Sequence, residues 1–241
     1  MPVSRLHVLN ERVVTCRRCP RLVAWREQVA RDKRAAFRDE SYWGRPVPAF
    51  GDPRARVVLV GLAPAAHGGN RTGRVFTGDR SGDWLFAALY RAGFANQATS
   101  RHRGDGLRLK DCYITACVRC APPANRPTVD ERDACLEHLA AELPLLKRAR
   151  VLVCLGAFAW EGVLRTLRAL GHRAARKPVF GHAAEAAVGP YVLLGCYHPS
   201  QQNTFTGRLT EAMLDAVLER ARALARTRFR REQVGRAAPS P

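Results

Sequence analysis

Short apolar runs alternate with helical patterns along most of the chain. Four runs of six or seven residues are rich in valine, isoleucine and leucine, as in parallel strands covered on both faces. Between and after them, apolar residues recur every three or four positions, as on the buried face of a helix. The pattern predicts an α/β fold: a three-layer αβα arrangement with a central four-stranded parallel sheet. The expected strands are 56–62, 112–118, 150–155 and 191–197, and the expected helices are 81–92, 128–143, 157–170 and 209–228.

The ends of the chain extend this core without adding a second domain. Two more helices are expected before the first strand, at about 4–15 and 20–37. Residues 231–241, REQVGRAAPSP, have no apolar pattern and predict a disordered tail. Residues 1–230 are therefore expected to form a single domain.

One helix start is closely specified by the sequence. Thr128 is followed three residues later by Glu131, which is the spacing of a capping box. By contrast, residues 95–108 have no periodic pattern and predict only a polar loop.

The most informative stretch follows the first predicted strand. Residues 61–82 read GLAPAAHGGNRTGRVFTGDRSG, a long glycine-rich loop that leads into a helix. It holds a carboxylate (Asp79), an aromatic ring (Phe76) and an imidazole (His67), and its glycines allow a ligand to approach the backbone. It is neither a P-loop nor a GxGxxG turn. The pattern predicts a ligand-binding loop, although an ordinary long surface loop has a similar composition.

Two other loops, 119–127 and 196–208, leave the carboxyl ends of predicted strands. Ligands of open α/β sheets bind at these ends, so the three loops are expected to frame one cleft. His198 lies in the third loop, in a His-Pro pair that on its own is more often structural than catalytic. The expected convergence of the loops makes it a candidate functional residue.

The chain is strongly basic. It has 241 residues, of which 40 are Lys or Arg and 21 are Asp or Glu, so its net charge is +19. This balance favours nucleic acid as partner over an acidic membrane surface. A GC-rich genome encodes arginine readily, which explains why arginine replaces lysine. It does not explain why basic residues outnumber acidic ones. No apolar stretch approaches the roughly 20 residues of a membrane span, and no signal peptide is visible, so a cytoplasmic protein is expected.

The eight cysteines are expected to be thiols or metal ligands rather than disulfides, because the cytoplasm is reducing. Cys16 and Cys19 form one CxxC pair, Cys117 and Cys120 form another, and Cys135 follows fifteen residues later. Four thiolates suit an iron–sulfur cluster or a structural zinc, and spacing does not choose between them. Nor does it choose firmly between Cys117, at a strand end, and Cys120, in the following loop. The candidate ligands are Cys16, Cys19, Cys120 and Cys135, whereas Cys112, Cys154 and Cys196 are expected to be buried as small apolar side chains.

Several of these stretches together resemble the family 5 uracil-DNA glycosylases, the B-type iron–sulfur branch of that superfamily. The resemblance rests on GLAPAAHGGNRTGRVFTGDRSG, the first CxxC pair, VRCAPPANRPT and YHPSQQNTFTGRLT, and covers roughly residues 12–225. It implies an αβα fold, a [4Fe-4S] cluster and removal of deaminated bases from DNA. It also implies that the cluster ligands are Cys16, Cys19, Cys120 and Cys135.

Cleavage of a glycosidic bond develops positive charge on the deoxyribose and negative charge on the departing base. Asp79 is expected to stabilise the sugar and to orient or deprotonate water, although the sequence alone fits a helix cap equally well. His198 is expected to donate to a base oxygen, and Phe76 to stack on the flipped base unless it is a core aromatic. Near the base we also expect backbone groups of Gly61, Leu62 and Ala63 and the side chain of Asn125. Against DNA we expect Ser200, Gln201, Gln202 and Arg208, with Gln201–Arg208 filling the space left by the flipped nucleotide.

The sequence also departs from the related family 4 enzymes. Those enzymes carry an acidic pair in place of Ala65–Gly69, and a uracil-reading asparagine where this chain has Ala116. This difference implies a looser pocket that also accepts hypoxanthine. We therefore predict a monomeric DNA glycosylase that starts base excision repair. A non-catalytic iron–sulfur protein that binds nucleic acid, or an enzyme acting on a small nucleotide, are the alternatives.

Overall fold

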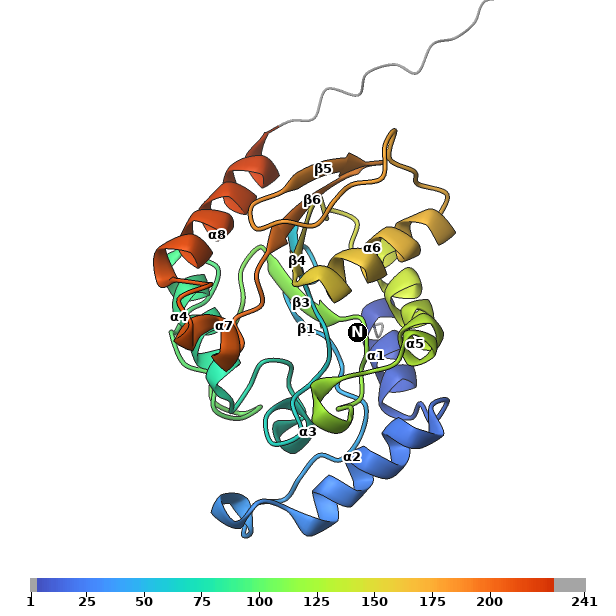
Figure 1. The fold of residues 1–241 in the computed structure, drawn as a ribbon, viewed down its shortest axis with the longest axis vertical. Helices are drawn as coiled ribbons and strands as arrows, with labels where there is room; N and C mark the ends of the chain where they lie inside the picture. The colour runs from blue at the N-terminus through green and yellow to red at the C-terminus, as the bar shows by residue number, and fades with distance from the viewer. Residues whose placement is uncertain (1–3, 228–241) are drawn as a thin grey trace, which may run out of the picture.

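The computed structural model describes residues 4–227 and is built around a six-stranded sheet (Figure 1). The strand order is β1-β3-β2-β4-β6-β5, and the four central strands are parallel. The strands are β1 (Phe50–Gly51), β2 (Val57–Gly61), β3 (Cys112–Ala116), β4 (Val151–Leu155), β5 (Glu185–Val188) and β6 (Tyr191–Cys196).

The predicted parallel core is confirmed, but the predicted number of strands is wrong. β1 and β5 pair antiparallel at the two edges of the sheet. Strand β1 has only two residues, and β5 alternates between exposed and covered positions instead of being buried on both faces. Neither edge strand therefore produces the continuous apolar run from which the central strands could be recognised.

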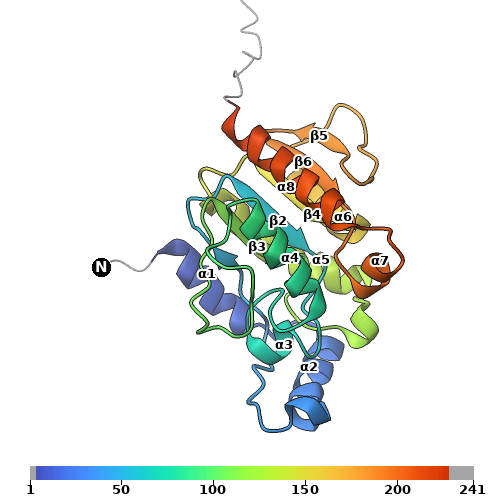
Figure 2. The same cartoon turned by 90° about the vertical axis from the view of Figure 1, so that its left-hand side faces the viewer.

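Helices cover both faces of the sheet (Figures 1 and 2). Side chains alternate along β2, so Val57 and Leu59 join one buried cluster with α4 and α8. Val58 and Val60 join a second cluster with α5 and α6 on the other face. The covering helices are α1 (Arg5–Val14), α4 (Arg80–Arg91), α5 (Val129–Glu142), α6 (Ala157–Ala169) and α8 (Glu211–Arg226), which agrees with the predicted three layers.

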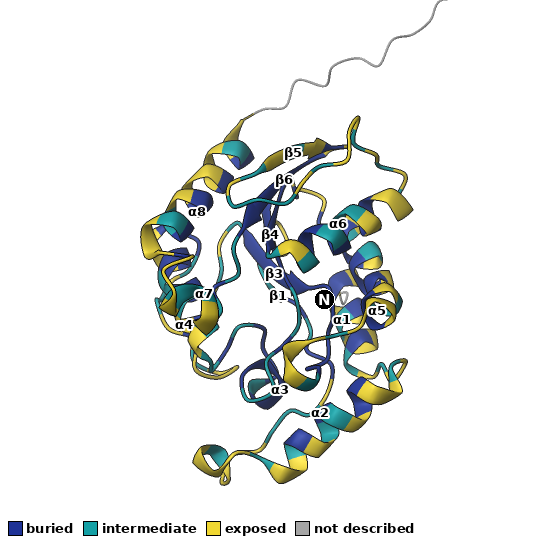
Figure 3. Cartoon of the chain, viewed as in Figure 1, coloured by how far each residue is buried: buried dark blue, intermediate teal, exposed yellow. Residues whose placement is uncertain are grey.

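Figure 3 shows the central strands in the buried class, with the exposed residues on the outer faces of the helices. Leu85, Phe86 and Leu89 of α4 are fully buried. Each such side chain contributes roughly 1.5–3 kcal/mol of burial free energy. The sheet and its covering helices are thus a rigid support for the loops at the strand ends.

Three short helices lie beyond the carboxyl ends of the strands: α2 (Pro20–Asp32), α3 (Gly69–Thr72) and α7 (Gln201–Phe205). The predicted helix at 20–37 is too long, because the chain turns at Lys33, whose φ is +50°, and only a single 3-10 turn follows. Helices α3 and α7 were expected as loop, since one or two turns show no apolar period. The capping box at Thr128 and Glu131 is confirmed. The predicted tail at 231–241 lies outside the described residues.

The order of the central strands reverses between β2 and β4. From β2 the chain crosses to β3 on one side, and it then returns to β4 on the other. Ligands of open α/β sheets bind where the strand order reverses in this way. In residues 4–227, no helix combines the length and apolarity needed to cross a bilayer.

Candidate active site and cysteine pocket

Asp79 begins α4 at the end of the loop that follows β2. Its Oδ1 accepts a hydrogen bond from the Gly82 N–H at 2.9 Å, so it is a helix cap, one of the two roles that the sequence suggested. Its Oδ2 lies against Gly68, where an added Cβ would stand 1.9 Å from that oxygen. Burial raises the pKa of the Asp79 carboxyl. A desolvated carboxylate held in one orientation can also serve catalysis.

Phe76 brings its ring to the end of β2. Its φ is +51°, a left-handed conformation that is uncommon for a bulky residue and marks a constrained site. The ring covers Gly61, where a Cβ would stand 2.9 Å from two ring carbons. It also lies beside the His198 imidazole, with ring centroids 5.8 Å apart and planes inclined by 34°. The loops after β2 and β6 therefore converge, as the sequence predicted.

Two hydrogen bonds fix the backbone of His198. Its carbonyl oxygen accepts hydrogen bonds from the Ser200 N–H at 2.8 Å and from Asn203 Nδ2 at 2.9 Å. Desolvation lowers the pKa of the imidazole to about 4. The ring is consequently neutral at pH 7, and one of its nitrogens can donate a hydrogen bond to an oxygen that becomes negatively charged.

These two pKa shifts predict the pH dependence of catalysis. Since the raised pKa of Asp79 protonates the carboxylate as the pH falls, activity should decline at a higher pH than an ordinary aspartate would dictate. His198 stays neutral above about pH 4, so no step is expected near the ordinary imidazole value of about 6.5. Single-turnover base excision measured from pH 4.5 to 9 should show one acidic limb and a plateau. A step centred between pH 6 and 7 that disappears in His198→Asn would contradict this assignment.

Two arginines stabilise the loop between β2 and α4 from within. Arg71 donates to the carbonyl oxygens of His67 at 2.8 Å and Gly78 at 2.9 Å, and its guanidinium lies 3.9 Å from the Phe37 ring centroid. The buried Arg74 donates to Thr77 Oγ1 at 2.9 Å. These basic residues are structural parts of the loop, so not all of the positive charge is available to a polyanion.

Gly61, Leu62 and Asn125 are three further predicted base contacts. The carbonyl oxygens of Gly61 and Leu62 accept hydrogen bonds from the Cys117 and Val118 N–H groups, each at 3.0 Å. They therefore extend the sheet beyond β3 and are rigidly placed. Asn125 lies on an exposed turn with φ +55°, and among the described residues no hydrogen bond joins its side chain to Phe76 or His198.

The predicted DNA contacts lie on and around α7. Ser200 Oγ caps this helix by accepting from the Asn203 N–H at 3.4 Å, and the guanidinium of Arg208 lies 4.8 Å from the Tyr197 ring centroid. Phe205 lies within Gln201–Arg208, the segment predicted to fill the space left by the flipped nucleotide, but the sequence analysis gave it no role of its own. It is 65% exposed, and its ring centroid lies 4.5 Å from the Arg80 guanidinium. A phenylalanine among the polar residues of this segment was the available signal. Gln201 and Gln202 are exposed on the same helix.

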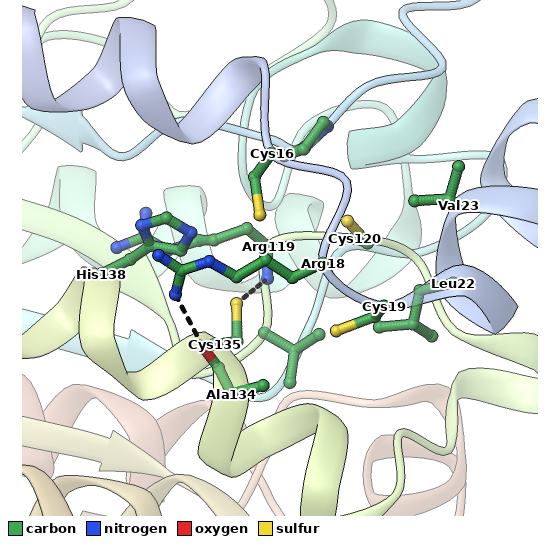
Figure 4. A pocket seen from close by; sticks show the side chains of 12 residues that line it. Cys16, Arg18, Cys19, Leu22, Val23, Arg119, Cys120, Ala134, Cys135 and His138 are labelled. Carbon is green, nitrogen blue, oxygen red and sulfur yellow. Dashed lines mark hydrogen bonds between the residues drawn. The ribbon is translucent and has the colours of Figure 1, made fainter.

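The four predicted cysteine ligands surround one pocket (Figure 4). Cys16 follows α1, Cys19 precedes α2, Cys120 lies in the loop after β3, and Cys135 lies on α5. Figure 4 shows their sulfur atoms directed toward a shared space. The structure thus joins chain segments that are more than 100 residues apart in sequence.

Cys117, the other possible ligand, points elsewhere. It is fully buried in the core between the sheet and α6, and its thiol lies 3.8 Å from the Ala159 carbonyl oxygen. A Cβ added at Gly162 would stand 2.5 Å from this sulfur. Cys117 therefore behaves as a packed core residue, and Cys120 lines the pocket.

The surroundings of the pocket fit an anionic group held by thiolates. Among the described residues, seven buried side-chain polar atoms have no hydrogen-bond partner, and four belong to Arg26, Arg119 and His138. Arg119 and His138 line the pocket, and Arg26 donates to Cys120 Sγ at 2.8 Å. Burial raises the pKa of the Cys120 thiol to about 11. At neutral pH this thiol therefore becomes a thiolate only when it binds a metal cation. Within residues 4–227, no three metal-binding side chains stand in an arrangement that could hold a metal ion.

Comparison with known proteins places this chain among the DNA glycosylases. The model of the uracil DNA glycosylase superfamily matches residues 48–222, so the chain belongs to that superfamily. A type-5 uracil-DNA glycosylase of Mycobacterium bovis is 56% identical over 219 residues, covering 90% of this chain and 81% of the relative.

Two further relatives carry the same description. The type-5 uracil-DNA glycosylase of Thermus thermophilus is 52% identical over 214 residues, covering 88% of this chain and 95% of the relative. That of Pyrobaculum aerophilum is 48% identical over 230 residues, covering 92% and 98%. The chain is therefore a member of the type-5 branch, and the resemblance seen in the sequence is confirmed.

Proposed function

We propose that this chain is a monofunctional DNA glycosylase that hydrolyses the N-glycosidic bond of uracil and other deaminated bases, and so starts base excision repair. The observation that carries the proposal is that the Phe76 ring and the His198 imidazole lie side by side at the carboxyl ends of β2 and β6. The Asp79 carboxylate, oriented by the Gly82 N–H, stands three residues after Phe76 in the same loop. The type-5 relatives, which are named as uracil-DNA glycosylases, support it.

Asp79 stabilises the positive charge that develops on the deoxyribose and orients or deprotonates the attacking water. Its burial strengthens this electrostatic effect, because little solvent screens the carboxylate. The hydrogen bond from Gly82 and the contact with Gly68 fix the carboxylate before substrate binds. This preorganisation means that little reorientation is needed during the reaction.

The departing base is recognised by a ring, an imidazole and the backbone. Phe76 stacks on the flipped base, and His198 donates to the base oxygen on which negative charge accumulates. Backbone groups of Gly61, Leu62 and Ala63 face the base edge. Asn125 supplies a further polar contact to the base or to the attacking water. The basic surface holds the DNA phosphates together with four residues on and around α7: Ser200, Gln201, Gln202 and Arg208.

Cys16, Cys19, Cys120 and Cys135 would hold a [4Fe-4S] cluster in the cysteine pocket. When bound, the cluster would tie the N-terminal helices to the loop after β3 and to α5. Arg26 and the Arg119 N–H, which donates to Cys135 Sγ at 3.3 Å, orient the sulfur atoms. This role is structural and does not require the cluster to take part in base excision.

A panel of oligonucleotides tests the proposed function. The purified protein should convert uracil in DNA to an abasic site, and release hypoxanthine as well, while adenine and cytosine remain. Free deoxyuridine should not be cleaved, because the DNA contacts are missing. Absence of abasic sites, with DNA binding retained, would favour the alternative of a non-catalytic iron–sulfur protein.

Ala116 should set the breadth of this substrate range. It ends β3, is buried, and pairs in register with Gly61, which the Phe76 ring covers. An asparagine there would offer both a donor and an acceptor to uracil and penalise bases that leave them unpaired. Ala116→Asn should therefore raise the ratio of uracil to hypoxanthine excision by about tenfold or more, in single-turnover assays with both substrates. Excision of uracil alone by the unmodified protein, even with excess enzyme, would refute this account of the pocket.

A further inference from the structure

The loop at Thr99–Arg103 is joined to the catalytic loop, although its sequence predicted only a polar connection. The Gly78 N–H donates to the Ser100 carbonyl oxygen at 3.0 Å, directly before Asp79. Arg74 donates to both carboxylate oxygens of Asp105 at 2.9 and 2.6 Å, and to Ser100 Oγ at 2.8 Å. These contacts are largely buried, so they fix the two loops relative to each other.

Asp105 also shapes the loop. Its carboxylate accepts hydrogen bonds from the N–H groups of Arg101 at 2.8 Å, His102 at 3.3 Å and Leu107 at 3.1 Å. The loop therefore has a defined conformation, in which the side chains of Arg101 and Arg103 are exposed. Among the described residues, no ion pair engages either of these two arginines, whereas Asp105 is paired with Arg74.

A groove of about 470 Å³ runs beside this loop and reaches the catalytic loop at Gly78. Arg101 and His102 line it, and so do two carboxylates. One of these, Glu40, is paired with Arg71 at 2.5 Å, and the other, Asp83, lies on the first turn of α4. The guanidinium of Arg103 stands 4.6 Å from the ring centroid of Trp43, and that of Arg45 stands 5.7 Å from it.

The two chain neighbours of Asp79 contact different surfaces. Gly78, on one side of it in the chain, lines the groove, and Arg80, on the other, contacts Phe205 of α7. We propose that Arg101 and Arg103 form a second phosphate-binding surface, which holds the DNA strand on the side of the flipped nucleotide away from α7. The proposal rests on the DNA glycosylase function and adds a contact surface to it. Because phosphate contacts fix register without reading bases, this surface serves every sequence context.

The salt dependence of binding tests this surface. Arg101→Gln/Arg103→Gln should weaken binding to duplex carrying a tetrahydrofuran abasic analogue by about tenfold at low salt. Its plot of log affinity against log salt should be shallower by about 1–2, since each lost phosphate contact removes about 0.9. Single-turnover excision at saturating enzyme should stay within about twofold of the unmodified protein, because Asp79 and His198 are untouched. Arg168→Gln/Arg173→Gln, an equal charge change at exposed positions on and just after α6, should leave the salt slope unchanged.

Shortened DNA locates the contact. Of two duplexes truncated on the 5′ or the 3′ side of the lesion, one should lose affinity for the unmodified protein but not for the double variant. If the double variant does not fold, Arg101→Gln alone should reduce the slope by about 1. An unchanged salt slope, or truncations that weaken binding of both proteins equally, would overturn the proposed phosphate-binding surface. Failure of the unmodified protein to release uracil would instead overturn the glycosylase function.

Discussion

Asp79→Asn should lower single-turnover uracil excision by about 10²-fold or more, which corresponds to about 2.7 kcal/mol of transition-state stabilisation. The substitution keeps the size of the side chain and its ability to accept the Gly82 hydrogen bond, but removes the negative charge. Affinity for DNA and the melting temperature should therefore change little. Because the loss lies in the charge, it should appear in the rate at saturating enzyme and not in binding.

A matched variant separates the charge at this site from a charge elsewhere on the surface. Asp130→Asn makes the same chemical change at an exposed position in the first turn of another helix, α5. It should cost at most the weak helix-dipole stabilisation, about 0.3–1 kcal/mol, and leave the excision rate within about twofold. Near-normal excision by Asp79→Asn would reduce Asp79 to a helix cap.

Cys135→Ser should remove the cluster and with it much of the stability. The purified protein should be brown with about four irons per chain, and this variant should be colourless and poorly soluble. Loss of the link between Cys19 and Cys120 releases a loop of roughly 100 residues, worth about 4–5 kcal/mol on a cross-link model. A fall of roughly 10 °C in melting temperature follows for a domain of this size.

Cys117→Ser is the matched control, because it exchanges sulfur for oxygen at a buried position outside the pocket. It should keep the iron and the colour. Iron analysis, absorbance and calorimetry of both variants are the measurements. A colourless unmodified protein with stoichiometric zinc would disprove the cluster while leaving the four-cysteine site intact.

The layers of the fold could be predicted because burial on both faces leaves a direct trace in the sequence. The four central strands are continuous apolar runs, and α4, α5, α6 and α8 repeat with helical period. The edge strands β1 and β5 could not be found, because one is too short and the other only partly covered. Helix α7 has five residues, too few for a period to appear.

The candidate site could be predicted where local motifs mark it and where the ends of parallel strands bring those motifs together. The loop at 61–82 is one continuous stretch of sequence, and Cys16 and Cys19 are three residues apart. Arg26 beside Cys120, and Arg74 beside Asp105, are contacts between segments 94 and 31 residues apart. No pattern in the sequence of either segment predicts which residue it contacts, so these interactions are known only from the structure.

The two glycines around the catalytic acid limit how this enzyme can evolve. A Cβ at Gly68 would meet Asp79 Oδ2, and one at Gly82 would meet the Phe76 carbonyl oxygen, each at 1.9 Å. Every substitution at these positions adds atoms, so none offers an intermediate step that spares the acid. New substrate preferences must then arise at other positions near the base, such as Ala116, which pairs with Gly61 at the end of β3. In this way the catalytic loop can be inherited almost unaltered while the range of repaired lesions diverges between lineages.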